Sequence, residues 1–209
     1  MQLIVISSSQ KVENETAIVT ELFENGLKAF HLRKPNFSTK DLKNYIKSIP
    51  SQYHNRIIIH SHHKIARTFD LKGIHLTKTH KNKKFKTWLT LQLIKAKNPN
   101  ILITTSYDKL ASILDDEEKF SYVFLSPIFD SLTSKYQSGF SEGGLKGALK
   151  KTSHRVIARG GIEISNIEKV NEIGFAGMAL YSAIWKKNDP LNEFIRIIEK
   201  CHELKIDIE

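Results

Sequence analysis

Short runs of β-branched or apolar residues recur along the chain, and longer polar or amphipathic segments separate them. Runs of this length between turn signals predict buried strands. Most connections are long enough for a crossover helix, which favours parallel strands. The predicted strands cover residues 3–6, 29–32, 56–59, 73–76, 101–104, 122–125, 156–158 and 177–180.

Helix boundaries can be predicted at several of the connections. Ser38-Thr39-Lys40-Asp41 fits a capping box, and Gly26 and Gly174 stand where helices should end. Residues 77–100 show no clean helical period, and Pro99-Asn100 supplies a turn before the fifth strand. We predict a helix within this segment, although its limits are not marked by the sequence.

Eight strand-helix units in 209 residues favour an α/β fold with a closed sheet, a single-domain (β/α)8 TIM barrel over residues 1–209. A content of 40% apolar and 26% charged residues is ordinary for a globular domain, and no apolar run reaches the length of a membrane span. Because active sites of such barrels form at the carboxyl ends of the strands, candidate residues are sought there.

Charge and cysteine content narrow the function classes. The excess of 32 Lys+Arg over 22 Asp+Glu gives a net charge of +10, but the lysine run at residues 78–86 has only Phe85 as an aromatic, so we interpret it as a solvated loop rather than a nucleic-acid site. A single cysteine, Cys201, excludes an intramolecular disulfide or a thiolate cluster. The first residues begin as a strand without a signal sequence, which predicts a cytoplasmic location and no membrane partner.

Two loops at adjacent strand ends are candidates for phosphate binding. Gly160-Gly161 follows the seventh predicted strand, and Tyr181-Ser182 follows the eighth. Paired glycines allow backbone N–H groups to approach an anion, and small residues after the last strand can open a short helix towards the same point. The alternative is that the glycines only form a tight turn.

Basic side chains at two other strand ends can meet an anionic ligand. Alternation places His31 and Arg33 on one side of the second strand, and Arg33 at a strand end favours a phosphate or diphosphate, with a structural carboxylate as the alternative. Ser126 opens a long polar loop after the sixth strand, where Thr133 and Lys135 stand. Lys135 is interpreted either as a residue that closes over phosphate or as one more solvated lysine.

Histidines gather after the third strand in His60-Ser61-His62-His63, and His75 stands near the end of the fourth. His60 and His62 could share a face. No cysteine or well-placed carboxylate completes a recognisable ligand set, so the histidines alone predict no metal site.

In this order, these segments resemble the family of thiamine phosphate synthase and the TenI-type thiazole tautomerases. His31-Leu32-Arg33 looks like the start of QLRxK, and Gly73-Ile74-His75-Leu76 looks like GVHL. The segment from Ser126 through Thr133 and Lys135 is similar to GPxFxTxTK, and residues 158–166 look like AxGGIxxxN. The resemblance covers nearly the whole chain and itself implies a (β/α)8 barrel.

The chain departs from the family at its catalytic positions. The resemblance implies Mg²⁺ held by acidic residues after the third and fourth strands, but Ser61 occupies the first position and residues 77–80 supply no carboxylate at the second. Tyr107 occupies the position of the tautomerase histidine. The residues themselves therefore predict no cofactor, and the expectation of Mg²⁺ comes from the resemblance alone.

The resemblance implies a thiamine-biosynthesis enzyme that binds hydroxyethylthiazole phosphate and couples it to aminopyrimidine methyl diphosphate. Catalytic roles then fall to His31, Arg33 and Lys135, phosphate binding to the Gly160-Gly161 and Tyr181-Ser182 loops, and the substrate pocket to His60, His75, Ser126 and Thr133. The alternatives are a TenI-like tautomerase with a histidine acid or base, and a non-catalytic phosphate-ligand-binding barrel. A homo-oligomer is compatible with the sequence, which leaves the oligomeric state open.

Overall fold

The computed structural model describes residues 1–129 and 140–209. The strand order is β1 to β8 in a closed parallel barrel, so the predicted (β/α)8 fold is confirmed. Contacts divide the chain into two compact units, residues 6–105 and residues 1–5 with 106–209. No helix among the described residues is long and apolar enough to cross a membrane.

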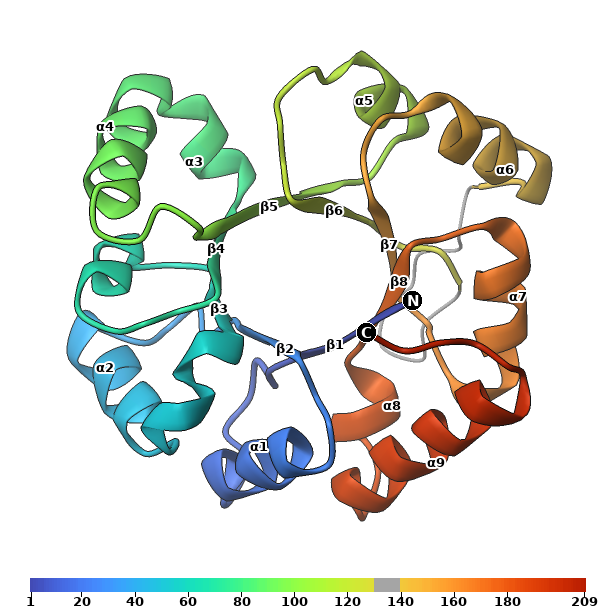
Figure 1. The fold of residues 1–209 in the computed structure, drawn as a ribbon, viewed down its shortest axis with the longest axis horizontal. Coiled ribbons are helices and arrows are strands. Elements are labelled where there is room, and N and C mark those ends of the chain that lie inside the picture. Colours follow the sequence, from blue (N-terminus) through green and yellow to red (C-terminus); the bar gives the residue numbers. More distant parts are fainter. Residues whose placement is uncertain (130–139) are drawn as a thin grey trace. The chain divides into compact units, whose positions relative to one another are not determined.

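The unit of residues 6–105 contains consecutive parallel strands with helices on their outer side (Figure 1). Buried isoleucines fill strand β3, as expected for a strand covered on both faces. The elements are α1 (Glu15–Glu24), β2 (Ala29–Leu32), α2 (Thr39–Lys47), the 3₁₀ helix η1 (Ser51–Arg56), β3 (Ile57–Ile59), the 3₁₀ helix η2 (His63–Arg67), β4 (Gly73–Leu76), α3 (Lys78–Asn82), α4 (Lys84–Lys95) and β5 (Leu102–Tyr107), whose last two residues belong to the other unit.

The other unit contains β1 beside β8, and β7 between β6 and β8, again with its helices outside the strands (Figure 1). Its elements are β1 (Gln2–Ile6, the last residue in the other unit), α5 (Leu110–Asp115), β6 (Tyr122–Leu125), α6 (Glu142–Lys151), β7 (Val156–Arg159), the 3₁₀ helix η3 (Ile164–Asn166), α7 (Ile167–Ile173), β8 (Gly177–Leu180), α8 (Ser182–Trp185) and α9 (Pro190–Glu203).

The local signals read from the sequence are found in the structure. Ser38 caps α2, with its side chain accepting from the N–H of Asp41 and the Asp41 carboxylate accepting from Ser38. Gly174 ends α7 at φ 97°, a left-handed conformation that glycine adopts without strain. Gly26, at φ 99°, follows the end of α1.

The lysine run at residues 78–86 is not a loop, and that prediction is wrong. It forms α3 and the first turn of α4, with Thr77 capping α3 through the ring of His80. Its lysines are largely exposed, as expected, but helix α4 also exposes apolar side chains. Because the helix buries only Ile94 fully, its sequence carries no clean apolar period.

Candidate functional site

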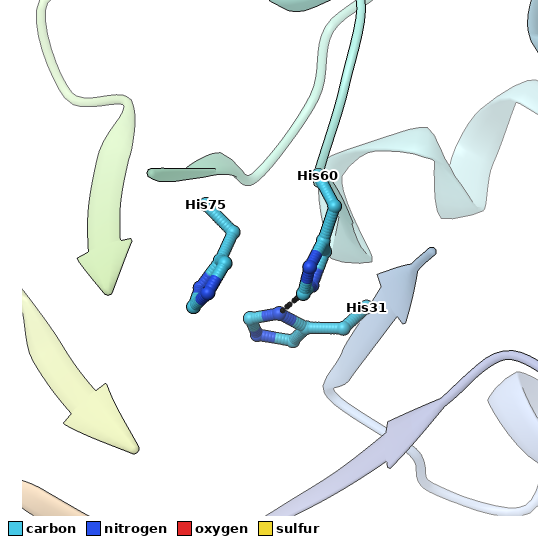
Figure 2. A group of neighbouring side chains, drawn as sticks. All are labelled: His31, His60 and His75. Atoms are coloured by element: carbon cyan, nitrogen blue, oxygen red, sulfur yellow. Dashed lines mark hydrogen bonds between the residues drawn. The ribbon is translucent and has the colours of Figure 1, made fainter. Parts of the chain in front are cut away.

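Three histidines from consecutive strands meet in the unit of residues 6–105 (Figure 2). His31 lies in β2, His60 directly follows β3, and His75 lies in β4. The register pairs Ile59 with Ile74, so the next residues along these strands, His60 and His75, are lateral neighbours. All three side chains are buried, with exposed fractions of 0%, 6% and 3%. The strands therefore bring together three residues that the sequence assigned to catalysis and the substrate pocket.

The three imidazole rings are in direct contact. Nδ1 of His31 lies 2.9 Å from Nε2 of His60 in a hydrogen bond. The rings of His60 and His75 stack with centroids 4.1 Å apart, and the ring of His31 meets that of His75 edge-on at 5.8 Å. One ring nitrogen from each histidine lies within 4.8 Å of the other two. We call these residues the histidine cluster; its nitrogens can carry a proton or bind a cation.

Thr104 of β5 holds the ring of His75. The register places Thr104 beside His75, and its hydroxyl oxygen lies 2.8 Å from Nδ1 of His75. The same hydroxyl approaches the carbonyl oxygen of Ile74 at 3.5 Å. Thr104 is buried, like the three histidines of the cluster. The sequence reasoning missed this residue, although a threonine beside a strand-end histidine was visible once the strands were aligned.

His62 lies apart from the cluster. Its backbone takes a left-handed conformation at φ 53°, which breaks the alternation of the strand. Its ring contacts Thr39 and the carbonyl oxygen of Phe37. The suggestion that His60 and His62 share a face is therefore wrong.

A basic hollow of about 440 Å³ lies beside η2, α3 and α4 in the same unit. Lys64, Lys83 and Lys86 contribute to its lining, together with His63 and His80, whose rings lie 4.3 Å apart. Burial lowers the pKa of His63 to about 4, and the neighbouring His80 contributes to the shift. His63 is therefore neutral at pH 7, and the lysines supply the positive charge of this hollow.

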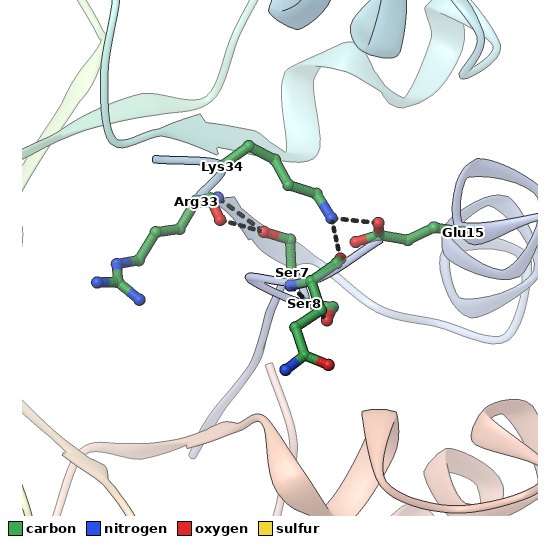
Figure 3. A network of polar contacts seen from close by, with 6 residues as sticks. Ser7, Ser8, Glu15, Arg33 and Lys34 are labelled. Atoms are coloured by element: carbon green, nitrogen blue, oxygen red, sulfur yellow. Dashed lines mark hydrogen bonds and ion pairs between the residues drawn. The ribbon is translucent and has the colours of Figure 1, made fainter. Parts of the chain in front are cut away.

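Arg33 and Lys34 follow β2 and have different environments (Figure 3). The side chain of Arg33 is exposed, and its guanidinium points away from Lys34. Its backbone is fixed by Ser7, whose hydroxyl accepts from the Arg33 N–H at 2.8 Å and donates to the Arg33 carbonyl at 3.1 Å. Arg33 is thus a cation on an anchored backbone and has no carboxylate partner among the residues described.

Lys34, in contrast to Arg33, is buried. Its ammonium forms an ion pair with the carboxylate of Glu15 and also donates to the carbonyl of Gln10 at 3.1 Å. The two charged side chains are only 4% and 6% exposed. Burial raises the pKa of the Glu15 carboxyl, and Lys34 opposes that shift. Lys34 therefore neutralises a buried carboxylate and does not project towards a diphosphate.

The two predicted phosphate loops lie side by side in the unit that contains β6 to β8. Strands β7 and β8 are paired with Arg159 opposite Ala179, and two residues further along are Gly161 and Tyr181. Gly160 and Gly161 have φ values of 92° and 65°. A Cβ atom at Gly160 would lie 3.0 Å from Cα of Pro127, so both conformation and space require glycine there.

Three backbone N–H groups of these loops are available to a ligand. Within residues 1–129 and 140–209, the N–H groups of Gly160, Gly161 and Ser182 have no hydrogen-bond acceptor. The side chain of Asn166 donates to the carbonyl of Gly161 at 2.8 Å and accepts from the N–H of Glu163, which fixes the shape of the first loop. N–H donors without acceptors at two adjacent strand ends suit an anion such as a phosphate group.

Arg159 is a cation of this unit to which the sequence reasoning gave no role. It is the last residue of β7 and is half-buried. Its guanidinium lies 3.4 Å from the hydroxyl of Ser106 and over the ring of Phe124 at 6.0 Å. An arginine directly before paired glycines was the available signal, because it puts a positive charge next to an anion-binding loop.

The remaining candidates have separate positions. Ser126 follows β6, and its N–H donates to the carbonyl of Tyr107 at 3.1 Å. The hydroxyl of Tyr107 bonds the Asp116 carboxylate, and its ring packs near His154. Burial and Asp116 raise the pKa of Tyr107. Thr133 and Lys135 lie outside the described residues.

The strand order and the strand-end groups define a (β/α)8 barrel with a candidate anion site. The family model for thiamine monophosphate synthase matches residues 3–184. The chain belongs to that family, which confirms the resemblance found in its motifs.

Individual relatives agree along nearly the full length. A thiamine-phosphate synthase from Methanococcus maripaludis is 24% identical over 208 residues, covering 98% of this chain and 94% of that protein. A thiamine-phosphate synthase from Vibrio campbellii is 26% identical, and the match covers 90% of this chain and 91% of that protein. A thiamine phosphate pyrophosphorylase structure from Bacteroides thetaiotaomicron has a TM-score of 0.73 at 26% identity and covers 98% of both chains.

The residues at the two positions where the resemblance implies acidic ligands, Ser61 and residues 77–80, do not fit the implied Mg²⁺. Mg²⁺ prefers oxygen ligands, above all carboxylates. In the part of the chain that the structure describes, the histidine cluster is the only group of three or more potential ligands, and it contains no carboxylate. Ser61 and residues 77–80 supply none either.

Proposed function

We propose that this protein binds hydroxyethylthiazole phosphate and couples it to aminopyrimidine methyl diphosphate, as a thiamine phosphate synthase-like transferase. The observation that carries the proposal is the pair of loops at Gly160-Gly161 and Tyr181-Ser182, in which the N–H groups of Gly160, Gly161 and Ser182 lack acceptors among the described residues. Membership of the thiamine monophosphate synthase family supports the choice of a thiazole phosphate as the ligand.

In the proposed reaction, the thiazole nitrogen forms a bond to the methylene carbon of the pyrimidine while the bond from that carbon to the diphosphate oxygen breaks. The electron pair of the broken bond leaves with diphosphate, and positive charge develops on the methylene group. Cations that meet the departing diphosphate lower the barrier. Arg33 is the described side chain proposed for this role, because its guanidinium is exposed on an anchored backbone. Lys135 remains a second proposed cation.

The binding step can be tested separately from the chemistry. Gly160→Ala should weaken binding of hydroxyethylthiazole phosphate at least about tenfold, because a side chain forces the loop to move. Gly174→Ala is the matched control, since Gly174 has a similar φ of 97° but no atom within 4 Å of its added Cβ. Isothermal titration of both folded variants gives the comparison, and equal affinities would refute the proposed phosphate loop.

Coupling is tested by incubating the protein with both substrates and a divalent cation and measuring thiamine phosphate by mass spectrometry. Arg33→Gln should lower kcat with little change in the affinity for the thiazole phosphate. Absence of product at high enzyme concentration would exclude the synthase activity.

A TenI-like tautomerase is the second candidate, and the buried hydrogen bond between His31 and His60 favours it. A paired imidazole can take and return a proton on a carboxylated thiazole phosphate. Ultraviolet-monitored aromatisation should then proceed and slow strongly in His31→Ala; an undiminished rate would exclude this role for His31. A protein that catalyses neither reaction, yet is stabilised by thiazole phosphate against thermal unfolding, is the non-catalytic binder.

A further inference from the structure

We propose that His31, His60 and His75 form a binding site for a divalent transition-metal ion of the Zn²⁺ class. The site does not depend on the proposed coupling reaction, because all three ligands come from this chain and lie within one compact unit. It differs in ligand chemistry from the carboxylate Mg²⁺ site that the family resemblance implies.

The spacing of the ring nitrogens is close to that of a zinc site. Zn²⁺ binds imidazole nitrogens at about 2.0–2.1 Å, which places nitrogens of a tetrahedral site about 3.3 Å apart. In the histidine cluster, Nδ1 of His31 and Nε2 of His60 are 2.9 Å apart, and all three ligand atoms lie within 4.8 Å of one another. The rings of His60 and His75 are stacked, so binding one ion requires them to rotate out of the stack until their nitrogens converge.

The backbone already holds the ligands in place. His31, His60 and His75 come from or directly follow three neighbouring strands, and the register makes His60 and His75 neighbours. Sites on strands keep their ligands in position better than sites on loops. The cluster is therefore preorganised by the same hydrogen bonds that build the sheet.

Thr104 supplies the outer contact that histidine ligands usually have. Its hydroxyl lies 2.8 Å from Nδ1 of His75. When Nδ1–H of His75 donates to this hydroxyl, the lone pair of the ring is on Nε2, so the contact selects the tautomer that can bind a metal. The hydroxyl itself can donate to the Ile74 carbonyl, 3.5 Å away.

The ligand set selects the class of metal. Three neutral imidazoles suit Zn²⁺, Co²⁺, Ni²⁺ or Cu²⁺, whereas Mg²⁺ requires oxygen ligands. No carboxylate belongs to the cluster among the residues that the structure describes. Three protein ligands leave a fourth position for water or for an oxygen atom of a bound molecule, which is the pattern of catalytic rather than structural zinc sites.

The test uses the full-length protein without an affinity tag, stripped of metal by a chelator and then dialysed. We expect Co²⁺ to bind with one equivalent per chain and to give the visible absorption of a tetrahedral or five-coordinate centre. Zn²⁺ should displace Co²⁺ and abolish that absorption, and a large excess of Mg²⁺ should not. No substrate is present, so the outcome is independent of the coupling and phosphate-binding experiments.

Substitutions assign the bound ion to the cluster. His31→Gln and His75→Gln should each weaken Co²⁺ binding at least about 100-fold, while His202→Gln, at an exposed position on α9, should leave it unchanged. Thr104→Val should weaken binding about 10–100-fold, the range for outer contacts of metal-ligating histidines, and Thr104→Ser should retain it. Thermal unfolding checks that each variant is folded. If a histidine variant does not fold, the comparison of Thr104→Val with Thr104→Ser tests whether the ion lies at the cluster.

Two results would overturn the proposal. One is the absence of saturable Co²⁺ and Zn²⁺ binding by the stripped wild-type protein. The other is binding that persists at wild-type affinity in a folded His31→Gln or His75→Gln variant, or in Thr104→Val where neither histidine variant folds, because the cluster would then not hold the ion.

Discussion

The hydroxyl of Thr104 lies 2.8 Å from Nδ1 of His75, and the parallel register of β4 and β5 places these two residues side by side. Both side chains are buried, so neither can exchange its partner for water without opening the unit. In metal-free protein, Thr104→Val should therefore lower the free energy of unfolding by about 1–3 kcal/mol, the penalty for an unsatisfied buried polar group. Urea denaturation measures the loss. Thr104→Ser keeps the hydroxyl and should lose less; equal losses would mean that packing, not the hydrogen bond, matters at this position.

The buried ion pair of Glu15 and Lys34 predicts that substitutions of these two residues have non-additive effects on stability. Lys34→Met leaves the Glu15 carboxylate buried without its cation, which should destabilise the protein by about 3–5 kcal/mol. Because burial already raises the pKa of Glu15, the variant should take up a proton on this carboxyl at a higher pH than the wild type does. The double variant with Glu15→Gln should regain part of the lost stability in denaturant titrations. Additive losses would contradict a direct pairing.

Gly177 and Gly147 predict opposite effects of the same substitution. A Cβ atom at Gly177 would overlap the carbonyl oxygen of Gln2 on the neighbouring strand and would lie 2.8 Å from Cδ1 of Ile157. Gly177→Ala should therefore destabilise the protein by about 1–3 kcal/mol or more. Gly147 lies in helix α6 with no atom within 4 Å of an added Cβ, so Gly147→Ala should stabilise by about 0.5–1 kcal/mol. Paired thermal unfolding curves test both signs.

Cys201 is predicted to be an inert thiol. It is fully buried on α9, and burial raises its pKa to about 11. A raised pKa favours the neutral thiol, so at pH 8 roughly a thousandth of the groups are thiolate, the form that reacts. A thiol reagent should modify the native protein far more slowly than the unfolded protein, and the rate should rise with pH. Rapid labelling of native protein at pH 8 would contradict the buried position.

Asn166 predicts a second way to perturb the phosphate loop without changing a glycine. Its side chain donates to the Gly161 carbonyl at 2.8 Å, so Asn166→Ala removes one bond that shapes the loop. Loss of about 1 kcal/mol should weaken thiazole phosphate binding roughly fivefold. Asn171→Ala, at an exposed site on α7, is the control. Unchanged affinity in Asn166→Ala would show that the loop keeps its shape without this bond.

The fold was predictable because buried parallel strands have a strong signature. Apolar runs such as the one ending at Ile59 read directly as strands, and glycines such as Gly174 marked helix ends. The prediction of a loop at residues 78–86 was wrong because the helices there are exposed and have few buried positions. A helix without a buried apolar stripe shows no helical period in its sequence, so periodicity cannot predict it.

The candidate site was predictable only in part. Gly160-Gly161 could be named as a candidate from the sequence, since paired glycines after a strand indicate a turn or an anion loop. The histidine cluster could not be predicted, because its members depend on how neighbouring strands align. His31 lies in the cluster, whereas His62 lies outside it because its own backbone is left-handed. The burial of Lys34 likewise depends on Glu15, a partner nineteen positions away that no local pattern connects to it.

The register that sets His60 beside His75 has a consequence for how such barrels diversify. The positions after adjacent strands are neighbours whatever side chains occupy them, so exchanging a few residues there changes the ion that a site prefers while the main chain stays as it is. In this chain, His60 and His75 stand at such positions, and the two positions expected to be acidic, Ser61 and residues 77–80, carry no carboxylate.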